Sequence, residues 1–211
     1  MYFFSRTARV RNGQMVPATN WAVELTGRVN RLTELDVQLW SSMLSPGLGT
    51  MAWSTFVPDL VSLDTANSKL AADQGFLDET TKGADMITEG GFDDIVLQLV
   101  HRAGTPPDHP QFAAVVSSAM SAGGFAKGGE VGVEIAQRAA ELTGLATSFL
   151  VATTGTYGGC AWISAASTLD ELQRGERQVS TDPDFIAYLD EHANGLFRPE
   201  VSTQVMWRRL V

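Results

Sequence analysis

Two stretches of the sequence carry side chains that could hold a small aromatic molecule. Asp36, Gln38 and Trp40 occur at every second position, and in an extended strand this spacing places them on one face. Trp53 follows in the next predicted strand, and Trp162 has an equivalent place in the second half of the chain. Carboxylate, amide and indole groups together offer hydrogen bonds and a flat aromatic surface. We therefore predict these five residues as substrate-binding.

Each of these residues also has a purely structural interpretation. Asp36 and Gln38 could form the solvated face of an edge strand. Trp53 and Trp162 could simply be core residues, since large aromatic side chains at matching positions of two similar segments usually share a packing role.

Arg6 and His101 are the candidate catalytic residues. Arg6 could orient an acidic or enolic group through charge-assisted hydrogen bonds. His101 is one of three histidines and follows Leu97 and Leu99 in an alternating pattern, which places all three on one face of a predicted strand. The alternatives are a surface ion pair for Arg6 and a position at the edge of the core for His101.

The sequence carries no recognisable metal or cofactor motif. Cys160 is the only cysteine, so a disulfide or a cysteine-based metal site within the chain is not expected. The segment "GGFAKGG" at 123–129 lacks the spacing of a phosphate-binding loop, and neither a G-x-S-x-G nor an H-E-x-x-H motif occurs. We predict no metal and no cofactor.

Charge and hydropathy exclude two classes of partner. The formal net charge of -9 and the absence of a basic patch argue against nucleic-acid binding. No apolar segment approaches the roughly 18 residues of a membrane span. The opening "MYFFSRTARV" lacks the order of regions of a secretory signal, so we predict a cytoplasmic protein.

The chain contains an internal repeat. When the first half is displaced by about 110 residues, identical residues coincide without a gap over much of its first fifty positions. The matched pairs include Gly13 with Gly123, Val23 with Val133, Glu24 with Glu134, Arg28 with Arg138, Leu32 with Leu142 and Gly49 with Gly159. Between the copies lies the Pro-rich segment 102–111. We predict a first repeat at 1–101, a linker at 102–111 and a second repeat at 112–211.

Periodicity and chain-breaking residues give the same order of elements in both repeats. The first is predicted to have a strand over 2–11, a helix over 16–30, a hairpin of strands over 35–42 and 50–57, a helix over 62–83 with Ser62 as N-cap and a break near Gly75, and a strand over 92–101. The second repeats this order from 112 to 211, and Gly144 closes its first helix. Each unit is β-α-β-β-α-β, the ferredoxin-like order.

Helices cover one face of such a sheet, so the other face needs a partner. We predict an α+β fold in which the two antiparallel sheets pack face to face as an intrachain pseudo-dimeric barrel. Leu35, Val37 and Leu39 would face the helices, which leaves Asp36, Gln38, Trp40 and Ser42 toward the interior. The matching positions Ala146, Ser148, Leu150 and Ala152 are smaller and less polar, so the first repeat would supply most polar groups of a pocket.

This tandem β-α-β-β-α-β order, with an aromatic first strand followed by an amphipathic helix, resembles the dimeric α+β barrel superfamily over the whole chain. That superfamily includes antibiotic-biosynthesis monooxygenases, NIPSNAP-type proteins and haem-binding chlorite dismutase-like proteins. The resemblance implies a fused pseudo-dimer that holds a ligand between its layers and associates further.

Two classes of function follow. One is a small-molecule-binding barrel acting as a cofactor-independent monooxygenase, cyclase or isomerase on an aromatic or polyketide-like substrate. The other is a non-catalytic binding or assembly protein that forms homo-oligomers through its edge strands. A haem protein, with His101 or His192 as axial ligand, ranks third, because no histidine can be matched to those relatives.

Overall fold

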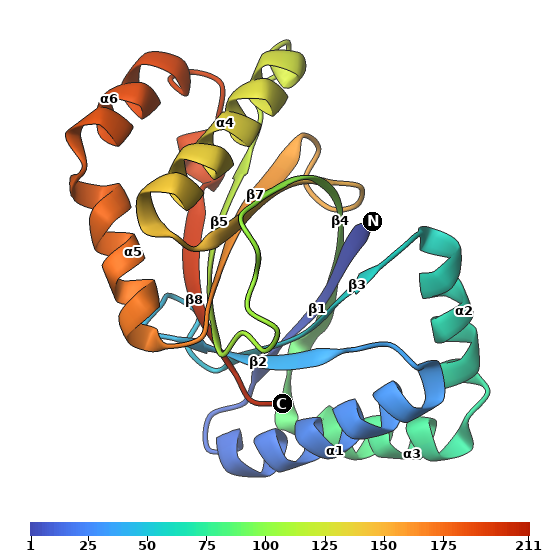
Figure 1. Cartoon of the computed structure of the whole chain (residues 1–211). Coiled ribbons are helices and arrows are strands. Elements are labelled where there is room, and N and C mark those ends of the chain that lie inside the picture. The colour runs from blue at the N-terminus through green and yellow to red at the C-terminus, as the bar shows by residue number, and fades with distance from the viewer. The chain divides into compact units, whose positions relative to one another are not determined.

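The computed structural model describes residues 1–211 and has the predicted mixed α+β architecture (Figure 1). The first half contains β1 (Tyr2–Val10), α1 (Met15–Thr33), β2 (Gln38–Met43), β3 (Thr50–Val57), α2 (Leu60–Ala71), α3 (Gln74–Gly83) and β4 (Ile87–Ala103). The second half contains β5 (Phe112–Ala119), α4 (Phe125–Thr143), β6 (Ala146–Ala152), β7 (Gly159–Ala166), α5 (Leu169–Thr181), α6 (Pro183–His192) and β8 (Thr203–Arg209). Both halves therefore follow the predicted β-α-β-β-α-β order, with the second helix divided in two. None of the helices has the length and apolar character needed to cross a membrane.

The strands form one antiparallel sheet that closes into a barrel in the order β1-β3-β2-β8-β5-β7-β6-β4. The chain divides into two compact units, which we call unit 1 (residues 1–96 and 209–211) and unit 2 (residues 97–208). The last strand of each half continues into the other unit. The second part of β4 pairs with β6 in unit 2, and residues 209–211 join β2 in unit 1.

The compact units thus differ from the two sequence repeats at their ends, and the repeat boundaries at 101 and 112 stay predictions about the duplication. β4 extends through Ala103, two residues into the predicted linker, and residues 104–111 then connect it to β5.

Side-chain caps fix where α2 and α3 begin. Ser62 is not the N-cap of α2, contrary to the sequence prediction. Asp59 caps that helix by accepting a hydrogen bond from the Ser62 backbone N–H at 2.7 Å. Asp73 caps α3 in the same way through the Phe76 N–H, so the break between the helices lies before Gly75. An aspartate suits an N-cap because its carboxylate accepts from an otherwise unpaired N–H near the positive end of the helix.

In unit 1, α1 packs its apolar face on the sheet. Trp21 and Leu25 from the helix form a buried cluster with Leu39 of β2 and Trp53 of β3. Val37 belongs to the same cluster and Leu35 packs at its edge. The predicted helix-facing side of the first hairpin strand is therefore correct.

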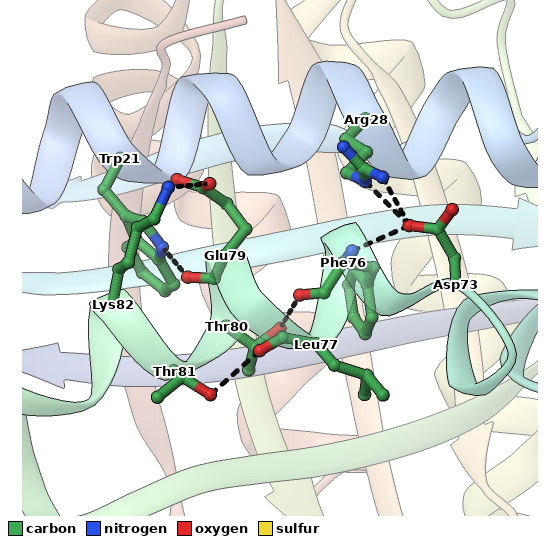
Figure 2. A network of polar contacts seen from close by, with 9 residues as sticks. All are labelled: Trp21, Arg28, Asp73, Phe76, Leu77, Glu79, Thr80, Thr81 and Lys82. Carbon is green, nitrogen blue, oxygen red and sulfur yellow. Dashed lines mark hydrogen bonds and ion pairs between the residues drawn. The ribbon is translucent and has the colours of Figure 1, made fainter.

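Helix α3 is fastened to α1 by polar contacts at two points (Figure 2). The Trp21 indole Nε1 donates to the Glu79 backbone carbonyl at 2.8 Å, and the Arg28 guanidinium donates to the Asp73 carboxylate at 2.6 Å. Gly83 permits the first contact, because a Cβ there would lie 2.1 Å from the Trp21 ring. Two separate contacts therefore hold α3 alongside α1.

In unit 2, α4 packs in the same way but with different side chains. Phe149 stands at the position equivalent to Leu39, and its ring lies directly over Gly132, which is equivalent to Ala22 of α1. The larger ring is thus accommodated by the smaller helix residue. Volume is conserved across the pair, as close-packed interiors require.

Candidate functional site

The face of the unit 1 sheet that looks away from the helices carries a buried polar cluster. Strand register pairs Trp40 with Ala52 and both Gln38 and Ser5 with Ser54, and directly opposed residues share a face. The Trp40 indole Nε1 donates to Ser54 Oγ at 3.0 Å. Trp40 and Ser54 are each only 7% exposed. On this face the Trp40 ring therefore lies next to the small side chains of Ala52 and Ser54, and the next pair along the strands is Phe3 with Phe56, whose ring centroids are 5.1 Å apart.

The first hairpin positions this cluster. Ser42 is buried on the same strand, where its hydroxyl donates to the Gly47 carbonyl at 3.1 Å and fixes the start of the hairpin loop. At the other end of β2, Gln38 Nε2 donates to the Asp36 carboxylate at 3.2 Å. The structure thus brings together three of the predicted binding residues, with Trp40 and Gln38 on one strand and Asp36 just before it. Asp36 is exposed and Gln38 is half-buried.

Trp53 and Trp162 lie elsewhere. Both point to the helix-facing side of their own unit and belong to the buried cores there. The Trp53 indole donates to Thr26 Oγ1 at 3.0 Å, and the Trp162 indole donates to the Gly132 carbonyl at 2.9 Å. This placement matches the core-packing interpretation of the two tryptophans, since neither indole N–H is available to a ligand.

Arg6 shares the face of Trp53, its register partner, and not the face of Trp40. Its guanidinium forms a bidentate ion pair with the Asp94 carboxylate, and both N–O distances are 2.7 Å. The hydrogen bond that Arg6 donates to Asp94 raises the pKa of Arg6, and Phe4 and Phe92 lie beside the guanidinium. The geometry is that of a half-exposed ion pair, the structural alternative for this residue.

His101 is not in phase with Leu97 and Leu99. A β-bulge separates Leu99, which pairs with Leu150, from His101, which pairs with Phe149. Since adjacent residues of β6 point to opposite faces, the bulge turns His101 onto the face of Phe149. The expectation that these three side chains share one face was therefore wrong, because an irregularity in strand pairing interrupts the alternation.

No imidazole lies in unit 1. His101, His109 and His192 all belong to residues 97–208, and His192 is stacked on Tyr188 of α6. No group of three or more histidine, cysteine or carboxylate side chains is placed to hold a metal ion. The cluster around Trp40 thus contains no imidazole that could bind a haem iron.

Sequence reasoning missed Arg209. This residue ends β8 and belongs to unit 1, and its guanidinium Nη1 is buried without a hydrogen-bond partner. The signal in the sequence was the pair Arg208–Arg209 at the end of an apolar strand, since alternation must turn one of two adjacent residues away from the helices.

Unit 2 contains an open cleft of about 760 Å³ at the end of α6. Its lining includes Leu189, Asn194, Phe197 and Arg198, and none of the predicted site residues. Arg198 is engaged there by Glu200 at 2.7 Å. None of the residues of the polar cluster of unit 1 lines this cleft.

Solved structures with this fold cover nearly the whole chain at very low sequence identity. A candidate monooxygenase from Fusobacterium nucleatum has a TM-score of 0.73 and 9% identity, covering 100% of this chain and 92% of its own. An anthrone oxidase-like protein has a TM-score of 0.71 and 10% identity, covering 100% and 91%. A chlorite dismutase variant from Candidatus Nitrospira defluvii has a TM-score of 0.55 and 12% identity, covering 98% and 91%.

No family model matches the sequence, and no curated protein matches it either. At these identities the structural likeness establishes the fold, which can carry unrelated chemistries. The chain thus shares the α+β barrel fold of these structures, with both halves of the barrel in a single polypeptide.

Proposed function

We propose that this protein binds a planar aromatic molecule against the Trp40 face of unit 1 and acts on it as a cofactor-independent oxygenase. The observation that carries the proposal is the Trp40–Ser54 cluster, in which an indole ring is held by a hydrogen bond among small side chains. The fixed indole offers a flat apolar surface for stacking.

The oxygenase part of the proposal draws support from the anthrone oxidase-like neighbour. An anthrone carries a CH₂ group between two aromatic rings, and loss of a proton gives an electron-rich enolate that can reduce dioxygen. One oxygen atom becomes the new carbonyl oxygen, and the other leaves as water with the two hydrogens of that carbon. The protein needs to bind the ring system, favour the enolate and exclude competing water.

Gln38 and Trp40 are the residues that we assign to ligand binding. Gln38 holds the Asp36 carboxylate at one end of the cluster, and this carboxylate is the titratable group that could accept a proton from the ligand. Arg6, Trp53 and Trp162 are engaged on the helix-facing side, and His101 belongs to unit 2. We leave these four out of the proposed site.

Binding is tested with 2-naphthamide, a neutral planar probe, through quenching of tryptophan fluorescence. Trp40→Phe should raise the dissociation constant several-fold, since it removes most of the stacking surface. Trp53→Phe is the control, because that indole lies on the opposite face, and it should bind the probe as the unmodified protein does. Unchanged binding by Trp40→Phe would place the ligand elsewhere.

Catalysis is tested with anthrone in an oxygen electrode. The proposal expects one equivalent of dioxygen to be consumed for each anthraquinone formed, at a rate above that of buffer and reduced in Gln38→Leu. A protein that binds the probe without accelerating oxygen uptake would be a binding barrel of other activity, or a non-catalytic assembly protein, which is the second candidate function. The edge-strand homo-oligomer expected for that class is measured by light scattering.

A further inference from the structure

We propose that Arg209 is a specificity-determining residue that binds an ionised oxygen of the aromatic ligand, so that the site selects anionic over neutral ring systems. This inference rests on the proposed function and adds to it the chemical class of the ligand. It concerns residues of unit 1 alone, because residues 209–211 and β2 belong to the same compact unit.

Hydrogen bonds at the end of the chain place Arg209 beside Trp40. The backbone N–H groups of Leu210 and Val211 both donate to the Leu39 carbonyl, at 2.7 and 3.5 Å, and the Leu39 N–H donates to the Val211 carbonyl. Two successive residues opposite one is the pairing of a β-bulge. Because the strands are antiparallel, Arg209 comes level with Trp40, the residue that follows Leu39.

The alternation of side chains along β8 leads to the same face. Met206 packs with the Leu172 cluster against the helices of unit 2. Trp207 therefore points away from the helices, and so does Arg209 two residues later. Arg208 points to the other face and is exposed.

Arg209 differs from the arginines that serve the fold. Arg6 is held by Asp94, and Arg28 by Asp73. Arg209 Nη1 is buried without any partner. A buried donor without an acceptor is unfavourable and is rare in folded proteins, so a group of this kind calls for a missing acceptor. A ligand oxygen at this position would supply it.

The chemistry of the guanidinium identifies that oxygen as anionic. Arginine is always protonated, and its planar fork matches carboxylate and phenolate oxygens through short charge-assisted bonds. The protein carries a formal charge of -9, which disfavours anions over its surface as a whole. A local cation next to an aromatic ring therefore selects a ligand that combines a ring with an ionised oxygen, such as an aromatic carboxylate or an enolate.

The experiment compares 2-naphthoate with 2-naphthamide, which have the same shape but differ in charge, in the full-length protein. The unmodified protein should bind the carboxylate at least about tenfold more tightly, the usual effect of a charge-assisted hydrogen bond. Arg209→Met should abolish that preference, because it weakens binding of the carboxylate far more than binding of the neutral amide. Arg208→Met is the matched control and should retain the preference. Arg209→Lys, which keeps the charge but not the fork, should retain part of it.

Thermal unfolding separates ligand binding from a structural role. If Arg209 serves the ligand, Arg209→Met should have an unchanged or higher melting temperature, because the substitution removes an unpaired buried donor. A lower melting temperature together with an intact preference for the carboxylate would overturn the inference. Equal affinities for the two probes in the unmodified protein would also overturn it, while leaving the proposed function in place. Failure of the unmodified protein to bind either probe would instead remove the proposed function and this inference with it.

Discussion

Gly132 of α4 and Phe149 of β6 fit together so closely that a Cβ atom on residue 132 would lie 2.3 Å from the end of the phenylalanine ring. In the first repeat the equivalent pair is Ala22 and Leu39, both fully buried. The two repeats therefore fill the equivalent space between helix and sheet with different pairs of side chains, a large one with a glycine in the second repeat and two of intermediate size in the first. The Trp162 indole donates directly to the Gly132 carbonyl. The Trp53 indole donates instead to the Thr26 hydroxyl, which in turn donates to the Ala22 carbonyl at 2.6 Å.

This pairing predicts that Gly132→Ala destabilises the protein by about 1–3 kcal/mol through overpacking. The double variant Gly132→Ala/Phe149→Leu recreates the pair of the first repeat and should be more stable than the sum of the single effects by about 1 kcal/mol. Urea denaturation of the four proteins of this cycle measures the coupling. Strict additivity would show that the two positions do not share a packing constraint.

The hydrogen bond between Trp40 and Ser54 predicts that the cost of removing the Ser54 hydroxyl depends on whether the Trp40 indole is present. Ser54→Ala leaves a buried indole N–H without an acceptor and should lower the free energy of unfolding by about 1–3 kcal/mol. In a Trp40→Phe background that N–H is absent, so the same serine substitution should cost much less. Chemical denaturation of both backgrounds gives the difference. An equal cost in the two would mean that Ser54 acts through packing alone.

The ends of α1 and α4 predict opposite effects of equivalent substitutions. Glu34 follows α1 with φ at 61°, and Gly144 follows α4 with φ at 72°. The left-handed conformation is strained for glutamate but not for glycine, so Glu34→Gly should stabilise the protein by up to about 1 kcal/mol. Gly144→Ala should destabilise it by a similar amount, since no atom lies near enough to the added Cβ to contribute a clash. Melting temperatures in the opposite order would contradict this explanation.

Acid unfolding depends in part on Asp73. Two hydrogen bonds lower the pKa of Asp73 below its ordinary value of 3.8. The bond donated by Arg28 has the larger effect, and the bond donated by the Phe76 N–H has the smaller one. A lowered pKa in the folded state means that the contribution to stability is present above pH 3.8 and is lost as the pH falls through the folded pKa. In Asp73→Asn, the free energy of unfolding should therefore fall less steeply as the pH is lowered. Asp64→Asn, at an exposed position of α2, is the control and should leave the profile unchanged.

Cys160 is expected to be chemically inert in the folded protein. It is 3% exposed, and burial raises the pKa of its thiol to about 12. Because the thiolate is the reactive form, a thiol reagent at about pH 8 should modify the native protein only as fast as it unfolds. The rate of modification should therefore follow the denaturant dependence of unfolding. Rapid labelling without denaturant would contradict both the burial and the raised pKa.

The sequence alone determined those features that depend on near neighbours. The repeat predicted two β-α-β-β-α-β halves, and the alternation along the first hairpin correctly separated Leu39, which packs under α1, from Trp40 on the opposite face. Periodicity of two residues is a local property of an extended chain, so it can be read without knowledge of the fold. Element ends were less accurate, because capping at Asp59 and Asp73 depends on the geometry of individual turns.

Only the tertiary structure decided which polar and aromatic groups have partners. The indole N–H groups of Trp53 and Trp162 are hydrogen-bonded within the helix-facing cores, and Arg6 is paired with Asp94. A β-bulge places His101 on the opposite face from the one that alternation predicted. Arg209 became a candidate site residue only because the end of the chain lies beside β2. It is about 170 residues from Trp40 along the sequence. Whether a side chain is satisfied is set by groups distant in sequence, and no local pattern records which of them the fold will bring near.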